Sequence, residues 1–132
     1  MISRKLSFIV MACCAFSSYA TPATDSLLVK YRQSAPHPFS IQAGHELWTH
    51  TVTNSEGEKK SCQSCHGLDL TNEGKHIKTQ KIIQPMALSV NPKRLTNEAK
   101  IEKWFKRNCN DVWERDCTAQ EKGDLLTYLL VQ

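Results

Sequence analysis

The segment Cys62-Gln63-Ser64-Cys65-His66 places two cysteines three positions apart, with a histidine directly after the second. This is the spacing for covalent attachment of a c-type haem. On one helical turn both thiols can reach the two vinyl groups on one edge of the porphyrin, and the next imidazole then points at the iron. The motif therefore predicts one covalent haem c, bound by Cys62 and Cys65, with His66 as the proximal axial ligand.

A Cys-x-x-Cys pair also occurs in zinc sites and thiol oxidoreductases, so the alternatives depend on context. A zinc site of four cysteines would have to recruit Cys109 and Cys117. These two lack the close ligand spacing of a zinc ribbon, and His66 would then have no role. The histidine and the signs of export described next favour haem.

Residues 1–20 have the pattern of a cleavable signal peptide. A basic start with Arg4 and Lys5 precedes the apolar run 6–16 and a small-residue cleavage site that ends at Ala20. The apolar run is too short to span a bilayer. The sequence therefore predicts export to the periplasm, with cleavage after Ala20.

The mature chain would have 112 residues, which is enough for one small domain. It would carry 15 basic and 13 acidic side chains, a net charge of +2 that does not indicate a nucleic-acid partner. No later segment predicts a membrane span in the mature form. A lipid anchor on Cys13 is a weaker alternative, because the apolar run before it is short.

The six cysteines divide by position. Cys13 and Cys14 belong to the predicted signal peptide, and the haem motif uses two more. Cys109 and Cys117 remain, and in an oxidising exported compartment such a leftover pair indicates a disulfide.

Helical periodicity surrounds the motif and predicts an all-α domain over residues 40–132, preceded by an N-terminal extension over 21–39. The extension contains a short helix over 25–33. Ser40 caps a helix over 41–53, in which Gly44 lies on the inner face and favours close approach of another helix.

Two further helices follow an irregular segment, 67–94, which is expected to wrap around the haem. Thr96 caps a helix over 97–108, and a capping box at Thr118 begins the last helix, which runs to the C-terminus. Gly123 in that helix is either a second close-approach position or a tolerated weak point.

This order of helices resembles the class I cytochromes c. In that fold the N- and C-terminal helices cross, and the middle helix and loops wrap around one covalent haem. The positions of Gly44 and Trp48 and of Leu125 and Tyr128 are similar to that crossing. The family usually takes its sixth ligand, a methionine, from the loop after the middle helix. The corresponding segment here, 107–117, has neither methionine nor histidine.

Met86 is the only methionine after the haem motif, and it precedes the middle helix instead of following it. The resemblance implies that this stretch lies on the proximal side. There Pro85 is similar to the proline whose carbonyl accepts a hydrogen bond from the proximal histidine. We therefore expect Met86 to pack in the core or against the haem, with ligation of the iron as an alternative.

Asn108 continues the inner face of the middle helix, which consists of Ile101, Trp104 and Phe105. An amide on a buried face needs a partner, and coordination to iron would supply one. The alternative is a helix C-cap satisfied by local backbone. A bridge between Cys109 and Cys117 would close a nine-residue loop, contribute about 2.5 kcal/mol on the chain-entropy model and hold Asn108 in place.

Two stretches sharpen the resemblance: Trp104-Phe105-Lys106-Arg107-Asn108-Cys109-Asn110-Asp111-Val112 and Cys117-Thr118-Ala119-Gln120-Glu121-Lys122-Gly123-Asp124. Together with Pro85-Met86-Ala87 and the haem motif, they are similar to the SHP-type cytochromes c, an oxygen-binding, high-spin branch of class I. In that branch an asparagine beside a disulfide is the distal ligand of the oxidised state, and oxygen or nitric oxide displaces it after reduction. The resemblance assigns the distal role to Asn108 and the bridge to Cys109 and Cys117.

The ligand determines the predicted function. An amide oxygen suits ferric iron better than ferrous iron, so reduction should open the site, whereas a methionine would close it. We therefore expect a high-spin monohaem cytochrome with His66 and a displaceable Asn108. It would accept an electron from a partner cytochrome and bind O₂, NO or CO.

Two other functions remain open. One is a low-spin electron shuttle ligated by His66 and Met86. The other is a haem oxidoreductase that acts on oxygen, nitric oxide or peroxide, for which Arg107 and Asp111 are the only nearby acid–base candidates.

Three histidines outside the motif could also ligate the iron, and five cations could form a contact surface. His45, His50 and His76 are expected to be solvated, and His76 lies in the haem-wrapping segment. A basic rim that steers an acidic redox partner is one interpretation of five cations, and an ordinary solvated surface is the other. These cations are Lys75, Lys78, Lys81, Lys93 and Arg94.

Overall fold

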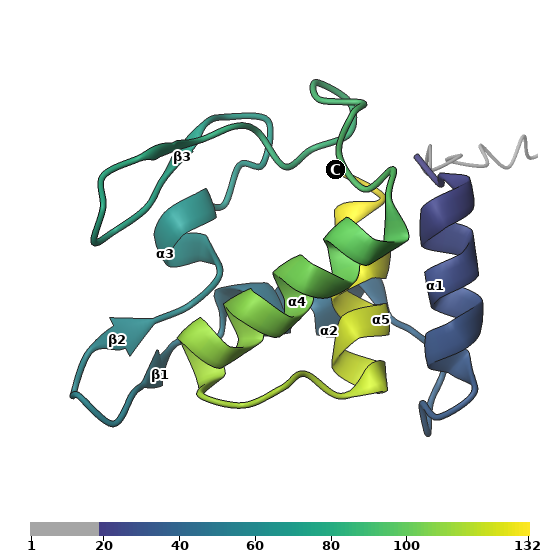
Figure 1. Ribbon diagram of the computed structural model, residues 1–132, viewed down its shortest axis with the longest axis horizontal. Coiled ribbons are helices and arrows are strands. Elements are labelled where there is room, and N and C mark those ends of the chain that lie inside the picture. The colour runs from purple at the N-terminus through teal and green to yellow at the C-terminus, as the bar shows by residue number, and fades with distance from the viewer. Residues whose placement is uncertain (1–18) are drawn as a thin grey trace, which may run out of the picture.

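The computed structural model describes residues 19–132, in which helices dominate as predicted (Figure 1). The helices are α1 (Pro22–Arg32), α2 (Ile41–Thr49), α3 (Gln63–His66), α4 (Glu98–Trp113) and α5 (Ala119–Leu129). Two antiparallel ladders pair β1 (Val52–Thr53) with β2 (Lys59–Lys60), and β3 (Gly74–Lys75) with β4 (Ile82–Ile83).

The predicted signal peptide, except its last two residues, lies outside the described residues, as do Cys13 and Cys14. Over residues 19–132, no helix has the length and apolar character that crossing a membrane requires.

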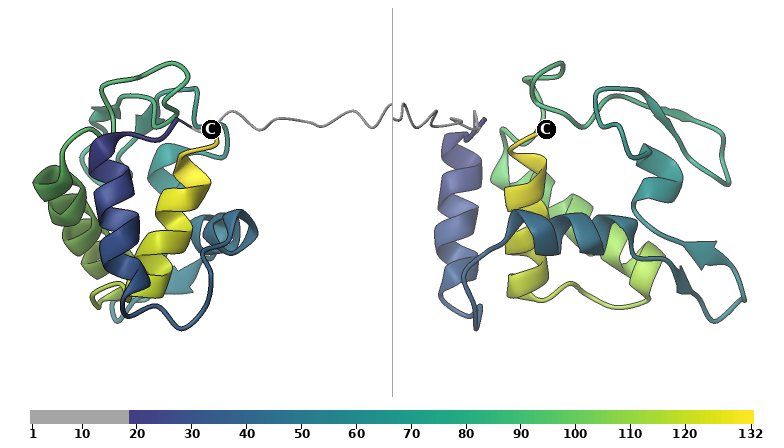
Figure 2. Two further views of the ribbon diagram at one scale, coloured as in Figure 1. Left: turned by 90° about the vertical axis from the view of Figure 1, so that its right-hand side faces the viewer. Right: turned by 180° about the vertical axis from the view of Figure 1, so that it is seen from behind.

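α2 lies across α5, and the crossing is close (Figure 2). A β-carbon on Gly44 would overlap the Asp124 carbonyl oxygen and would lie 2.6 Å from the Tyr128 β-carbon. Ser40 caps α2 as predicted, since its side chain accepts a hydrogen bond from the Ala43 N–H at 3.2 Å. The predicted close approach at Gly44 is therefore confirmed.

α2 is shorter than predicted and ends at Thr49 instead of residue 53. The following residues, Thr51, Val52 and Thr53, are all β-branched and favour extended backbone. Val52 and Thr53 accordingly form β1 and pair with β2, which delivers the chain to the haem motif.

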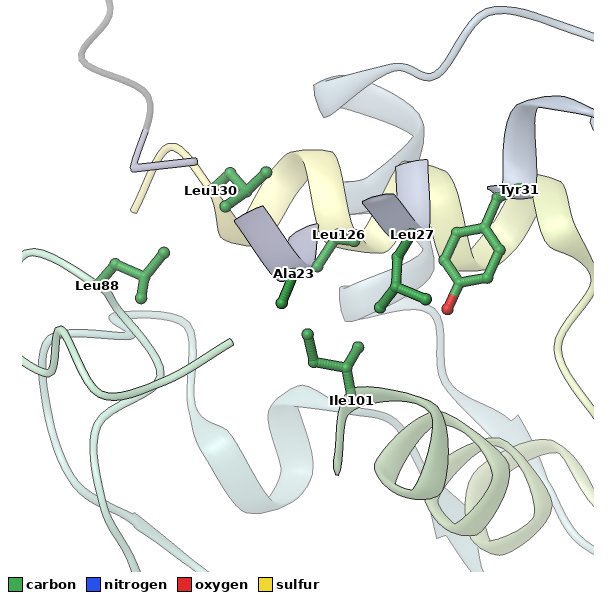
Figure 3. Packing of buried hydrophobic residues seen from close by; sticks show 7 residues of the cluster. All are labelled: Ala23, Leu27, Tyr31, Leu88, Ile101, Leu126 and Leu130. Atoms are coloured by element: carbon green, nitrogen blue, oxygen red, sulfur yellow. The ribbon is translucent and has the colours of Figure 1, made fainter. Parts of the chain in front are cut away.

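α1 begins at Pro22, three residues before the predicted start, because Thr21 and Thr24 form a reciprocal capping box. The helix lies beside α5 (Figure 2). Its inner face joins a buried cluster with side chains from α4, α5 and the segment before α4 (Figure 3). The cluster consists of Ala23, Leu27, Tyr31, Leu88, Ile101, Leu126 and Leu130.

α4 differs most from the prediction. It begins after Asn97 instead of Thr96, because the Asn97 side chain accepts a hydrogen bond from the Lys100 N–H at 2.8 Å. It also continues five residues past Asn108 to Trp113, where Glu114 ends it with a left-handed φ of 54°. Asn108 therefore lies inside a helix, so the predicted helix end at residue 108 and the alternative of a C-cap at Asn108 are both wrong.

α5 begins as predicted, with a capping box between Thr118 and Glu121. Gly123 in this helix is also a close-approach position, since a β-carbon there would be 2.4 Å from the Phe39 Cζ. The chain between α4 and α5 is thus reduced to residues 114–118; of the predicted cysteine pair, Cys109 lies in α4 and Cys117 in this connecting segment.

Candidate haem site

The haem motif forms a single helical turn. Cys62 precedes α3, and its carbonyl accepts the His66 N–H at 3.2 Å. Within the motif, the Ser64 hydroxyl accepts the Ser61 N–H at 3.0 Å and lies 2.8 Å from the Ser61 hydroxyl. Gly67 then ends the turn with a φ of +78°, a conformation that favours glycine.

A cavity of about 640 Å³ lies between the α3 turn and α4. Its volume is within the range of about 300–1,000 Å³ that is usual for small-molecule and cofactor sites. The predicted site residues that line it are Cys62, Cys65, His66, Met86, Asn108 and Cys109. The cavity thus joins residues from segments more than 40 positions apart.

His66 is held on the α3 side of this cavity. Its ring centroid is 5.3 Å from that of Trp48, whose indole N–H donates to the Gly67 carbonyl at 3.0 Å. Burial, together with the nearby Arg94 cation, lowers the pKa of His66 to about 4. The imidazole is therefore neutral at physiological pH, which is the form that binds metals.

The hydrogen bond expected between His66 and Pro85 is absent. His66 Nδ1 is buried without a hydrogen-bond partner in the described residues. The Pro85 carbonyl instead accepts from Asn91 Nδ2 and from Arg94 Nε, each at 3.1 Å. A carbonyl has two lone pairs, and these two donors use both.

Arg94 is a half-buried cation at the cavity wall. Besides Pro85, it donates to the Gln84 carbonyl at 2.6 Å, and burial lowers its pKa. It forms no ion pair in the part of the chain that the structure describes. Arg94 is thus a cation that is held in place and has no carboxylate partner, in the same cavity as the two cysteines and the neutral histidine. Such a cation suits a haem, because the propionates of a haem are anionic.

The basic rim, one of the two interpretations of the five cations, is partly present. Lys81, Lys93 and Arg94 line the cavity, and two cations outside that set of five, Lys100 and Arg107, line it as well. Lys78 instead pairs with Glu58 at 3.1 Å, and Lys75 is absent from the lining.

Asn108 lies on the α4 side of the cavity. Its side chain is exposed, so the buried position expected from the helical pattern is wrong. The next residue, Cys109, is bonded to Cys117, with the two Cα atoms 5.6 Å apart and both side chains buried. The bridge joins this turn of α4 to the start of α5.

Met86 packs on the same side as the haem motif. Its N–H and that of Ala87 both donate to the Leu70 carbonyl, at 3.0 and 2.9 Å. Its side chain contacts the buried cluster that contains Trp48 and Leu70. The structure thus brings Met86 and Asn108 to one cavity, but from different walls.

The alternatives to haem fit the cysteines poorly. Burial raises the pKa of the Cys62 thiol to about 11, which disfavours the thiolate that a redox nucleophile requires. Cys109 and Cys117 are bonded to each other, so they cannot complete a four-cysteine zinc site. His45 and His50 are exposed, as expected.

His76 is more buried than expected and lines the cavity. Its Nδ1 accepts the N–H groups of Lys78 and Thr79, each at 3.2 Å, so the ring is held by its own loop.

The helical fold and the haem-binding motif on a cavity of cofactor size together define a c-type cytochrome with one covalent haem. Residues 34–129 match the family described as "Domain of unknown function (DUF1924)". The cytochrome c-type protein SHP of Cereibacter sphaeroides is 41% identical over 123 residues, which are 93% of each chain. Cytochrome c'' of Methylophilus methylotrophus is 38% identical over 93 residues, which are 70% of this chain and 65% of its own. The chain therefore belongs to the family of SHP-type cytochromes c.

Solved structures agree with this assignment. Oxidised SHP, described as an oxygen binding cytochrome c, is 40% identical, with a TM-score of 0.75 over 83% of this chain and 96% of its own. Oxidised cytochrome c'' is 34% identical, with a TM-score of 0.74 over 83% and 94%. The predicted class I fold and the predicted single haem c are thus confirmed.

Proposed function

We propose that this protein is an exported periplasmic cytochrome c that accepts electrons and binds a diatomic ligand such as oxygen or nitric oxide. In this proposal Cys62 and Cys65 attach the haem, and His66 and a displaceable Asn108 are its axial ligands. The haem supplies a redox-active iron with one coordination position open to exchange. SHP, the relative described as oxygen binding, supports the gas-binding role.

The observation that carries the proposal is the environment of Asn108. Its side chain lines the cavity from the α4 wall, whereas His66 lines it from the α3 wall. The two side chains therefore border one space from two walls, which is the arrangement that the two axial ligands of one haem require. The Cys109–Cys117 bridge supports the role because it limits the movement of this turn.

The chemistry of the amide explains why its bond would be reversible. An amide oxygen is a neutral, hard donor that binds ferric iron better than ferrous iron. Reduction would therefore weaken the bond, and the Asn108 side chain could withdraw and admit a diatomic molecule. A thioether such as Met86 would behave in the opposite way, which is the basis of the alternative low-spin shuttle.

Charge supports a role in electron transfer. Arg94 and four further cations line the cavity. The acidic residue in the lining, Asp111, is already paired with Lys60. After two propionates are neutralised, an excess of positive charge would remain at the cavity edge. Such an edge would attract an acidic electron-donor protein, in practice a partner cytochrome.

Export is supported by the position of α1. The predicted cleavage after Ala20 would make Thr21 the first residue of the mature chain, and Thr21 is the cap of α1. The mature protein would then begin with an ordered helix, and N-terminal sequencing of the periplasmic protein should start at Thr21.

The ligands can be tested with holoprotein carrying Asn108→Ala or Met86→Leu. We expect Asn108→Ala to change the optical and electron paramagnetic resonance spectra of the oxidised form, while Met86→Leu leaves them as in the wild type. The reduced wild-type protein should bind carbon monoxide. Failure to bind carbon monoxide, or loss of the native spectrum only in Met86→Leu, would contradict the proposal and favour the low-spin shuttle.

A further inference from the structure

Lys60 is a buried cation two residues before the haem motif. Its side chain is 7% exposed, and its ammonium group donates to Asp111 Oδ1 at 3.1 Å and to the Asp111 backbone carbonyl at 3.3 Å. Glu58 Oε2 lies 3.5 Å away. The hydrogen bond that Lys60 donates to Asp111 raises the pKa of Lys60 despite its burial, so the group is charged.

On the α4 side, the Lys60 ammonium group supplies a hydrogen-bond donor and a positive charge to the last turn of the helix. Asp111 is among the last four residues of α4, whose carbonyls have no intrahelical donor. The last turn of α4 contains no basic residue, although a cation there is favoured by the helix dipole. Lys60 supplies that charge from a segment 51 positions away.

On the other side, Lys60 is joined firmly to the haem motif. It ends β2, where it is paired with Val52. The next residue, Ser61, is 3% exposed and bonds to the Ser64 hydroxyl through both its N–H and its own hydroxyl. Ser64 lies between the two haem-binding cysteines. A displacement of Lys60 relative to the motif would therefore strain these two part-buried hydrogen bonds.

These contacts make Lys60 a direct connection between the two walls of the cavity. Asp111 lies three residues after Asn108, which is about one turn along the same helix. The α3 turn carries His66, so the two expected axial ligands are on the elements that Lys60 joins.

We propose that Lys60 is a positioning residue for Asn108. By binding Asp111, it holds the last turns of α4 at a set distance from the haem motif, so that the Asn108 amide can reach the iron in the oxidised protein. Without this bond, the end of α4 can move outward and Asn108 is displaced more easily. The inference rests on the proposed function, in that Asn108 is the distal ligand.

The test uses the oxidised holoprotein with Lys60→Met, which keeps the length of the side chain and removes the charge. We expect imidazole to bind about tenfold faster than to the wild type, because a charged hydrogen bond that favours the ligated position is lost. Asp111→Asn should act in the same direction. Lys60→Arg, which keeps the charge, should lie closer to the wild type.

Lys78→Met is the matched control, because Lys78 also pairs with Glu58 but is 52% exposed and makes no contact with Asp111. It should leave imidazole binding unchanged. Haem content and far-ultraviolet circular dichroism report folding separately. If Lys60→Met lowers haem content, Asp111→Asn provides the same measurement, since Asp111 is largely exposed.

A double mutant separates positioning from general loosening. In an Asn108→Ala background, Lys60→Met should produce no further acceleration, because the ligand that it positions is gone. An equal acceleration in that background, or a wild-type rate for the single variant, would overturn the role of Lys60. An oxidised Asn108→Ala protein with a wild-type spectrum would instead contradict the ligand assignment itself.

Discussion

Gly44 of α2 lies against the Asp124 carbonyl of α5 so closely that a β-carbon has no room between them. The Ser40 N–H, at the start of α2, also donates to Asp124 Oδ1 at 2.8 Å. Two contacts from one helix thus fix α2 on α5. One turn after Gly44, Trp48 packs against the His66 ring, so this crossing also positions the histidine of the haem motif.

Replacement of Gly44 by alanine should destabilise the protein by about 1–3 kcal/mol or more, because the overlapping atom at Asp124 is backbone and cannot rotate away. The free energy of unfolding of the holoprotein in urea measures this effect. Gln42→Ala, at an exposed position of the same helix, should change it by less than about 0.5 kcal/mol. Equal stability of Gly44→Ala and wild type would show that the helices can separate without cost.

The packing of α1 can be tested at Leu27, which is 1% exposed in the cluster shared with α4 and α5. Leu27→Ala should lower the free energy of unfolding by about 2–5 kcal/mol, since it leaves a cavity in the core. Val29, on the same helix but 67% exposed, provides the control. A small effect at Leu27 would mean that α1 contributes little to the fold in solution.

Arg94→Gln should lower the reduction potential of the haem, on the order of tens of millivolts. A cation near the iron disfavours the oxidised form, which has one more positive charge, so its removal favours oxidation. Arg94→Lys should have a smaller effect because it keeps the charge, although it loses the hydrogen bonds to Pro85 and Gln84. Potentiometric titration measures the change, and an unchanged or raised potential would contradict the prediction.

Glu102 of α4 should make stability depend on pH, because it bonds to Lys122 of α5 at 2.7 Å and to Lys30 of α1 at 2.9 Å. Burial alone would raise the pKa of Glu102, but the bonds to both lysines outweigh it and lower the pKa below the ordinary value of 4.5. The stabilisation is therefore fully present above pH 4.5 and is lost as the pH falls through the lower folded-state value.

Comparison of the wild type with Glu102→Gln measures this contribution. The wild type should unfold at a higher temperature at pH 7, and the difference should shrink in acid below the folded-state pKa. A difference that is independent of pH would show that Glu102 acts through packing and not through its charge.

Local features of the fold could be predicted where neighbouring residues determine them. The caps at Ser40 and Thr118 are hydrogen bonds between residues three apart, and both are present. The end of α4 could not be predicted in the same way. Asn108 resembles a helix end, but the helix continues because Cys109 and Val112 pack in the interior.

The same distinction, between features set by neighbouring residues and features set by packing, applies to the candidate site. The amino-acid sequence alone determined the haem motif and predicted His66 as the proximal ligand, because the two thiols and the imidazole lie within one turn and their spacing is set by covalent geometry. Only the tertiary structure decided that Pro85 bonds to Asn91 and Arg94, and that Lys60 bonds to Asp111. Such partners are brought together by the packing of whole helices and loops, so no spacing along the chain encodes them.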